Sequence, residues 1–300
     1  MPSALEPTGI WRKPDEMHRH ERSGCELFHE PVCCMVFRIA LSFYLAILAF
    51  PALSAEPGGP VVSATDLASR LNAWQQDGAS YVRLRMVVSQ PSGKSALQIQ
   101  IKARRTKTAT DVVYQILWPK ERKGESVLLR KTGDRSASGS IFVPPSAPRP
   151  IDASQMKEPL FDSDLSYEDL VDNFFSWEHQ ALVGTEDLDG VSCQILESKP
   201  GKDDRSSYLS VRTWVDARRL VPLRIEKYAA RGLVRRIDAS NVVTDDIGGH
   251  VPANLTVRGS QRDSVTEIDG SRIKHDVTYA DGQFIPEALK EVTIPRSGAE

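Results

Sequence analysis

Few residue patterns in this chain have the spacing that chemistry requires. The 300 residues contain no Gly-x-Ser-x-Gly elbow, no glycine loop that binds phosphate, no His-Glu-x-x-His and no Cys-x-x-Cys motif. The acidic pairs Asp203-Asp204 and Asp245-Asp246 could hold a cation, but both adjoin turn residues, where aspartate accepts hydrogen bonds from nearby backbone. We therefore interpret both pairs as turns and predict no catalytic residues, no metal site and no cofactor.

The histidines and the cysteine of the later chain also favour structural roles. His179, His250 and His275 lie far apart in the sequence on predicted strands or turns, which favours ordinary surface positions. Cys193 alternates with Val191 and is expected to be a small buried hydrophobic residue. We therefore predict that the protein is not an enzyme. Converging polar residues inside a cavity would be needed to revive that alternative.

The charge balance narrows the range of partners. Lysine and arginine total 38, aspartate and glutamate total 40, and the formal net charge is −2. Binding nucleic acid through bulk charge needs a clear basic excess, so we expect no nucleic-acid partner. A basic cluster at Lys102, Arg104, Arg105 and Lys107 could contact phospholipid head groups or could simply be the solvated end of a strand. Both interpretations stay open.

The N-terminal region has the pattern of an export signal. Arg38 precedes an apolar run from residue 39 to residue 50, and small residues lead up to Ala55, which are the three parts of a secretory signal peptide. We predict a signal peptide at residues 35–55, translation from Met35 rather than from residues 1–34, and a periplasmic mature chain of residues 56–300. That chain keeps Cys193 as its one cysteine and cannot form an internal disulfide.

The mature chain is expected to be mainly strand. A short helix with Leu67, Ala68, Leu71 and Trp74 on one face precedes Gly78, and the apolar period then changes from 3.6 to 2. A hairpin with one apolar and one polar face is predicted around the turn at Pro91-Ser92-Gly93. Further strands are predicted at residues 114–118, 126–131, 140–143, 177–185, 191–197, 207–216, 221–228, 233–240, 251–258, 264–269 and 272–279. Four prolines, at positions 144, 145, 148 and 150, are expected to break any sheet.

A short amphipathic helix is predicted in the middle of the chain. Ser166-Tyr167-Glu168-Asp169 resembles a capping box with aspartate in place of the usual glutamate. The apolar residues Tyr167, Leu170, Val171, Phe174 and Phe175 follow at helical spacing. A last helical turn is predicted near residues 287–290. A sheet of about ten strands must curl, and the few helices leave its apolar face either with space for a greasy ligand or filled as an ordinary core.

Three strings resemble the periplasmic lipoprotein carriers LolA and LolB, and especially a related family of outer-membrane lipoprotein-sorting proteins. They are FDSDLSYEDL at residues 161–170, TWVD at 213–216 followed by LRIEKY at 223–228, and FIPEAL at 284–289. The resemblance implies a mainly β fold: a single large antiparallel sheet curled into an unclosed half-barrel and covered by a few short α-helices. It covers nearly all of residues 56–300 and implies an apolar cavity for acyl chains.

The implied function is a monomeric periplasmic carrier that shuttles a lipid or lipoprotein between envelope membranes. Its partners would be acyl chains and either a transporter of the resistance-nodulation-division type or an outer-membrane acceptor. The alternative is a lipid-sensing module that signals to a membrane partner. Arg83 and Arg85 fall in an early strand, where LolA relatives use an arginine to hold the lid, but their phase places them on the polar face. That role is not transferred to them.

The predicted ligand-binding and lid residues are the apolar positions of the first strands and of the middle helix. Plain core packing is the alternative interpretation of each position. The cavity residues are Val82, Leu84, Met86, Leu97, Ile99, Ile101, Tyr114, Ile116 and Trp118, and the lid residues are Tyr167, Leu170, Phe174 and Phe175.

Overall fold

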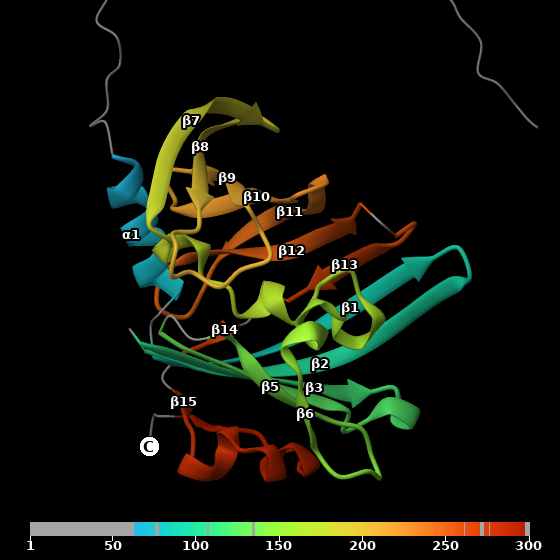
Figure 1. The fold of residues 1–300 in the computed structure, drawn as a ribbon. Helices are drawn as coiled ribbons and strands as arrows, with labels where there is room; N and C mark the ends of the chain where they lie inside the picture. The colour runs from blue at the N-terminus through green and yellow to red at the C-terminus, as the bar shows by residue number, and fades with distance from the viewer. Residues whose placement is uncertain are drawn as a thin grey trace, which may run out of the picture. The chain divides into compact units, whose positions relative to one another are not determined.

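The computed structural model describes residues 63–297 except 76–77, 107, 134–135, 261, 271–272 and 276 (Figure 1). The predicted signal peptide and the predicted start at Met35 lie outside the described residues. Within the described part of the chain, no helix combines the length and the apolar character needed to cross a bilayer.

The described chain begins with the predicted helix, α1 (Ala64–Gln75). The Ser63 hydroxyl accepts a hydrogen bond from the backbone N–H of Asp66 at 3.0 Å, which is an N-cap. The apolar side chains of Leu67, Ala68 and Leu71 are at most 3% exposed. Gly78 then takes a positive φ of 57°, which separates the helix from the first strand.

The strands form one large antiparallel sheet, as the sequence predicted (Figure 1). Its strands are β1 (Ala79–Gln90), β2 (Gly93–Arg105), β3 (Ala109–Trp118), β4 (Ser126–Thr132), β5 (Ser138–Phe142), β6 (Arg149–Ile151), β7 (His179–Leu188), β8 (Val191–Lys199), β9 (Ser210–Asp216), β10 (Val221–Ala229), β11 (Gly232–Thr244), β12 (His250–Gly259), β13 (Val265–Asp269) and β14 (Ile273–Lys274). The order is β6-β5-β4-β3-β2-β1-β13-β12-β11-β10-β9-β8-β7, with β14 beside β1. Because β6 and β7 remain as edges, the described strands form a half-barrel rather than a closed barrel.

Two details of the predicted strands are wrong. The proline-rich stretch does not break the sheet, because β6 pairs with β5 and places Pro150 opposite Ser140. An edge strand tolerates proline, since one side of its backbone has no ladder partner. The strand predicted at residues 272–279 is divided between β14, which pairs with β1, and β15 (Val277–Thr278), which pairs with β16 (Arg296–Ser297).

The amphipathic helix predicted after Ser166 is also wrong. The chain there forms two separate 3-10 turns, η4 (Glu168–Leu170) and η5 (Phe174–Ser176). Between them Val171 has φ −127° and ψ −10°, and Asn173 has φ −106° and ψ 75°, so the backbone leaves the helical region. Acidic side chains of this stretch form ion pairs with the distant strands β4, β10 and β11, and these contacts fix the irregular path of the backbone.

The end of the chain covers the outer face of β2–β5 (Figure 1). We call residues 279–293 the C-terminal strap; it contains the 3-10 turns η6 (Asp281–Phe284) and η7 (Pro286–Lys290), so the predicted last helical turn is confirmed. The strap and the sheet share an apolar cluster of Val113, Leu128, Phe142, Phe284 and Leu289.

A row of buried amides on this outer face is satisfied by the strap. The Gln100 amide donates to Gln115 Oε1 at 2.7 Å and to the Thr293 carbonyl at 3.1 Å. The Gln115 amide donates to Ser126 Oγ at 2.8 Å and to the Leu289 carbonyl at 3.3 Å. The sequence predicted the polar face but not the segment that covers it.

Two residues of the basic cluster at the end of β2, Lys102 and Arg104, also anchor the strap. Lys102 is 3% exposed and its ammonium donates to Thr293 Oγ1 at 2.5 Å. Burial lowers the pKa of Lys102 to about 8, while the charge of Glu291 acts in the opposite direction. The Arg104 guanidinium lies 4.8 Å from the centroid of the Phe284 ring. Lys102 is therefore not at a solvated strand end.

Candidate functional site

The concave face of the sheet is filled by the chain between β6 and β7. We call residues 152–177 the middle segment; it contains η2 (Ala153–Lys157), η3 (Leu160–Asp162), η4 and η5. It contributes the buried side chains of Met156, Leu160, Phe161, Leu165, Tyr167 and Val171 to the main apolar cluster. The sheet contributes Met86, Val88, Leu97, Ile99, Ala103, Val112, Tyr114, Ile116, Val127, Leu129, Ile151, Val257 and Ile268. The apolar face predicted for a ligand is thus covered by side chains of the protein itself.

Most of the predicted cavity residues meet on this face. Met86, Leu97, Ile99, Tyr114 and Ile116 belong to the main cluster, and the partly buried Leu84 and Ile101 pack against it.

The two remaining predicted cavity residues differ. Val82 pairs with Ile101 and is half-buried, but it is not part of the main cluster. Trp118 is 51% exposed, so its predicted place in the cavity is wrong. The register between β2 and β3 shifts after Ile116, and Trp118 lies opposite the exposed Gln98, on the outer face of the sheet. This irregularity reverses the alternation at the last residue of the strand.

The four predicted lid residues are divided between two clusters. Tyr167 is buried in the main cluster and Leu170 packs against it. Phe174 and Phe175 lie in a second cluster, where α1 and η5 cover β8 and β9. The buried members of that second cluster are Leu67, Ala68, Leu71, Phe174, Phe175, Trp177, Leu196, Tyr208, Val211 and Val215.

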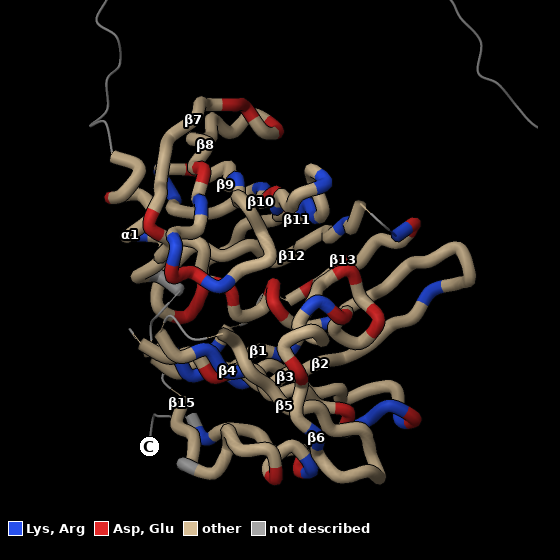
Figure 2. The backbone as a smooth tube through the Cα atoms, in the orientation of Figure 1, with Lys and Arg blue, Asp and Glu red and all other residues tan. Residues whose placement is uncertain are grey.

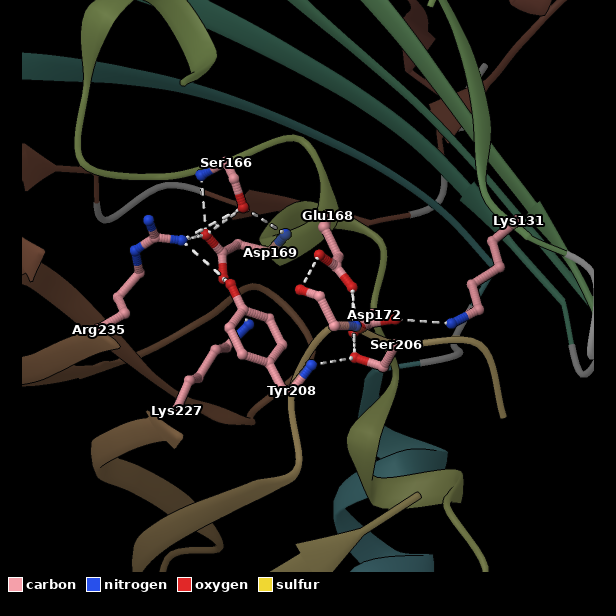
Figure 3. Close-up of polar contacts among 10 residues, drawn as sticks. Lys131, Ser166, Glu168, Asp169, Asp172, Ser206, Tyr208, Lys227 and Arg235 are labelled. Atoms are coloured by element: carbon pink, nitrogen blue, oxygen red, sulfur yellow. Dashed lines mark hydrogen bonds and ion pairs between the residues drawn. The ribbon is translucent and has the colours of Figure 1, made fainter. Parts of the chain in front are cut away.

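A buried carboxylate holds the middle segment at this junction (Figure 3). Asp169 Oδ2 accepts hydrogen bonds from the Ser166 N–H and the Ser166 hydroxyl, both at 2.7 Å, and the Asp169 N–H donates back to Ser166 Oγ at 3.3 Å. This is the reciprocal bonding pattern of the capping box that the sequence indicated, but here it precedes the short 3-10 turn η4 rather than an α-helix. Asp169 also pairs with Arg235 of β11 and, at 2.8 Å through Oδ1, with Lys227 of β10. Tyr208 donates to Asp169 Oδ1 at 2.7 Å.

Lys227 is a charged residue inside an aromatic environment. Its side chain is 2% exposed, and its ammonium lies 4.8 Å from the ring centroid of Tyr208 and 5.5 Å from that of Phe174. Burial lowers the pKa of Lys227 to about 8, while the charges of Asp172 and Glu168 act in the opposite direction. Burial also raises the pKa of Tyr208, which keeps its hydroxyl a donor.

Two further acids of the middle segment extend the network (Figure 3). Glu168 accepts hydrogen bonds from the Ser207 N–H at 2.6 Å and the Ser207 hydroxyl at 2.5 Å. Asp172 pairs with Lys131 of β4 at 2.8 Å and accepts a hydrogen bond from Ser206 at 2.6 Å. We call the contacts of Glu168, Asp169 and Asp172 the latch, because they join one irregular segment to β4, β10, β11 and the loop before β9.

Asp164 fixes the other end of this stretch. Its Oδ1 accepts a hydrogen bond from Ser264 at 2.5 Å, and its Oδ2 accepts one from Thr266 of β13 at 2.7 Å. The middle segment is therefore held by polar contacts at both ends of the string SDLSYED, and by apolar contacts between them.

Two cavities flank the middle segment. A cavity of about 480 Å³ lies between α1 and the segment and is lined by Asn72, Thr108, Lys131, Val171 and Asn173 among others. A second, of about 320 Å³, lies beside Ser166, Tyr208 and Arg235.

Acidic and basic residues are interspersed over both halves of the sheet (Figure 2), in keeping with the small net charge.

A family described as an uncharacterized protein matches residues 108–291, more than half of the chain. The chain belongs to this family. No curated protein matches the sequence at a significant level.

Three solved structures share the fold. A DUF1329 family protein from Desulfovibrio piger is 24% identical with a TM-score of 0.70, and the match covers 75% of this chain and 97% of that chain. A putative outer membrane lipoprotein-sorting protein domain from Vibrio parahaemolyticus is 17% identical with a TM-score of 0.68, covering 76% and 98%. A LolA superfamily protein from Nitrosomonas europaea is 18% identical with a TM-score of 0.60, covering 76% and 99%. The resemblance stated from the sequence is confirmed at the level of the LolA-like fold.

The structure explains two of the strings that carried the resemblance. The string at residues 161–170 and the string at 223–228 meet through the ion pair of Asp169 and Lys227. Sequence reasoning missed Lys227, Arg235 and Tyr208 as partners, because they lie at least 39 residues from Asp169 along the chain. The sequence contains one signal of this contact: Lys227 is a charged residue within the strand-like run LRIEKY at residues 223–228.

Proposed function

We propose that this LolA-like protein is a periplasmic carrier that binds acyl chains of a lipid or lipoprotein on the concave face of its sheet. The observation that supports the proposal is the composition of the main cluster, where a continuous apolar sheet face is covered by a segment with only 3-10 turns. Such a cover lacks the hydrogen-bond ladder of a strand and the full bonding of an α-helix. It can leave the sheet without breaking the sheet's own backbone hydrogen bonds.

The proposed binding energy comes from exchange of apolar contacts. Transfer of an acyl chain from water contributes roughly 0.8 kcal/mol per methylene, and one long chain on the order of 10 kcal/mol before ordering costs. Because the middle segment gives up similar apolar contacts when it leaves, the net affinity is smaller. That competition makes release possible, as a shuttle requires.

The proposed lid is the middle segment around Tyr167, Leu170, Phe174 and Phe175, and the latch is its closing contact. Opening would expose the concave face through separation of Asp169 from Lys227 and Arg235. The mechanism has no covalent step. The proposed ligand residues are those predicted cavity positions that belong to or pack against the main cluster.

The proposed setting is the periplasm. It rests on the export signal read at residues 35–55, with cleavage after Ala55. Donor and acceptor are membranes of the envelope, with a resistance-nodulation-division transporter or an outer-membrane acceptor as partner. N-terminal sequencing of protein recovered from the periplasm is expected to begin at Glu56. A chain that still begins at Met1 would refute the export signal.

Lipid binding and transfer are measured separately. Native mass spectrometry of protein purified from periplasm is expected to show a co-purifying lipid, and a fluorescent fatty acid is expected to bind with one saturating site. Absence of both would refute lipid binding. Transfer is tested by moving a fluorescent lipid from donor to acceptor vesicles. Binding without faster transfer would favour the lipid-sensing alternative over the carrier.

A further inference from the structure

The loop between β11 and β12 brings an acidic pair next to a histidine that is distant in sequence. Asp245 and Asp246 follow β11, and His275 follows β14. One ligand atom from each of the three residues lies within 4.8 Å of the other two. His275 Nδ1 is 2.5 Å from Asp246 Oδ1 and 3.9 Å from Asp245 Oδ2. A turn alone does not need the histidine.

One carboxylate oxygen of this group is buried without a hydrogen bond. Asp245 Oδ1 accepts hydrogen bonds from the N–H groups of Ile247 at 3.1 Å and Gly249 at 2.7 Å, which is the turn role that the sequence indicated. Within the described part of the chain, Asp245 Oδ2 has no hydrogen-bond partner, although the side chain is 0% exposed. Buried carboxylate oxygens are normally hydrogen-bonded or bound to a cation, because loss of hydration is unfavourable.

We propose that Asp245, Asp246 and His275 bind a divalent transition-metal cation of the Zn²⁺ type. Zinc accepts imidazole nitrogen and carboxylate oxygen at about 2.0–2.2 Å in tetrahedral geometry, which sets ligand atoms about 3.4 Å apart. The 3.9 Å separation must therefore shorten by about 0.5 Å and the 2.5 Å separation widen by about 1 Å. Asp246 is 44% exposed in its side chain, which leaves a path to solvent, and its Oδ2 accepts a hydrogen bond from the His275 backbone N–H at 2.9 Å, which keeps the carboxylate beside the ring.

The ligand set selects among cations. Calcium and magnesium prefer all-oxygen shells, whereas an imidazole nitrogen beside two carboxylates suits zinc or a neighbouring transition metal. Water would complete the coordination. The bound ion would join the β11–β12 loop to the end of β14, which pairs with the start of β1. Its role would be a cross-link between distant strands rather than catalysis.

The test is zinc titration of the full-length reduced chain by calorimetry. Residues 1–62 carry three histidines and three cysteines, so the site is assigned from differences between variants. His275→Gln and Asp245→Asn remove a ligand while keeping size and, for Asp245, the Oδ1 acceptor. His179→Gln and Asp203→Asn are matched controls at another histidine and in the other acidic pair.

The expected result is loss of one zinc equivalent, or at least tenfold weaker binding of it, in His275→Gln and in Asp245→Asn, with both controls within twofold of the unmodified protein. A second measurement follows the histidine ring signals by NMR, where the signal missing in His275→Gln is expected to shift with zinc. Titrations of the two ligand variants that superimpose on those of the controls would overturn the proposal. Such a result would mean that the hydrogen bonds between His275 and Asp246 are the whole role of this group.

Discussion

Replacing Asp169 by asparagine tests whether the middle segment is a lid. The carboxylate is 1% exposed and faces Lys227, which is 2% exposed, as well as Arg235. Asparagine keeps the size and one acceptor but leaves the buried ammonium without its counter-ion. Removing one partner of a buried ion pair costs about 3–5 kcal/mol, and we expect that loss in the free energy of unfolding measured with urea.

The same change should strengthen binding of an acyl probe. In the proposed mechanism only the open form binds, so the apparent Kd equals the intrinsic Kd divided by the open fraction. Weakening the closed form by about 3 kcal/mol raises a small open fraction on the order of 100-fold, since about 1.4 kcal/mol corresponds to tenfold. The apparent Kd of an uncharged fluorescent acyl ester, which brings no carboxylate of its own to Lys227 and Arg235, should fall by up to that factor, until the segment is mostly open.

A matched control separates lid opening from general loss of stability. Asp111 of β3 is also buried and contacts two cations, Arg104 at 2.9 Å and Arg130 at 2.5 Å. Both arginines contact Phe284 of the C-terminal strap, which covers the outer face of the sheet, whereas the middle segment covers the concave face. Asp111→Asn should lower the free energy of unfolding without tighter binding of the same acyl ester. If Asp169→Asn folds but binds the probe no better than Asp111→Asn, the latch does not control access and the reasoning fails.

Three further outcomes follow from the packing. The pKa of Lys102 is about 8 in the folded protein and 10.5 in the unfolded chain. Between these pH values the unfolded chain binds more protons, so the free energy of unfolding rises by up to about 1 kcal/mol per pH unit. Lys102→Met should flatten that rise in urea titrations, and an unchanged slope would contradict the prediction. Phe174→Ala should lower the free energy of unfolding by about 3–5 kcal/mol and accelerate amide exchange in α1, which packs against this ring. Unchanged amide protection in α1 would contradict this prediction. In Gly139→Ala the new methyl would lie 2.7 Å from the Leu128 carbonyl, so we expect a loss of about 1–3 kcal/mol by urea unfolding, against little change in Gly184→Ala, where the nearest atom is 3.8 Å away.

The sheet was predictable because its signal is local. The alternation in β1 and β2 repeats every two residues, and the turn at residues 91–93 fixes their register. The structure pairs Gln90 with Gly93 and Val82 with Ile101, which keeps the apolar residues on one side. Trp118 departed from the pattern because one irregular pairing reversed its side, and a single residue at a strand end carries no alternation of its own.

The middle segment was not predictable from spacing alone. Apolar residues at positions 167, 170, 171, 174 and 175 fit one helical face, but here they serve two clusters joined by an irregular turn. The choice between these arrangements depends on Asp169 and Asp172, whose partners lie on distant strands. Local spacing contains no information about such pairs, and their contacts override the helical preference.

The latch also bears on how a carrier could close again after release. An acyl chain can replace the apolar contacts of the middle segment, since methylenes pack against the same sheet residues. It cannot replace the contacts of Asp169 with Lys227 and Arg235, which need a carboxylate at that point. A buried ion pair adds little net stability but penalises every arrangement that separates its members inside the protein. In the proposed mechanism the apolar face therefore sets how tightly cargo competes, and the latch sets the one position to which the segment returns.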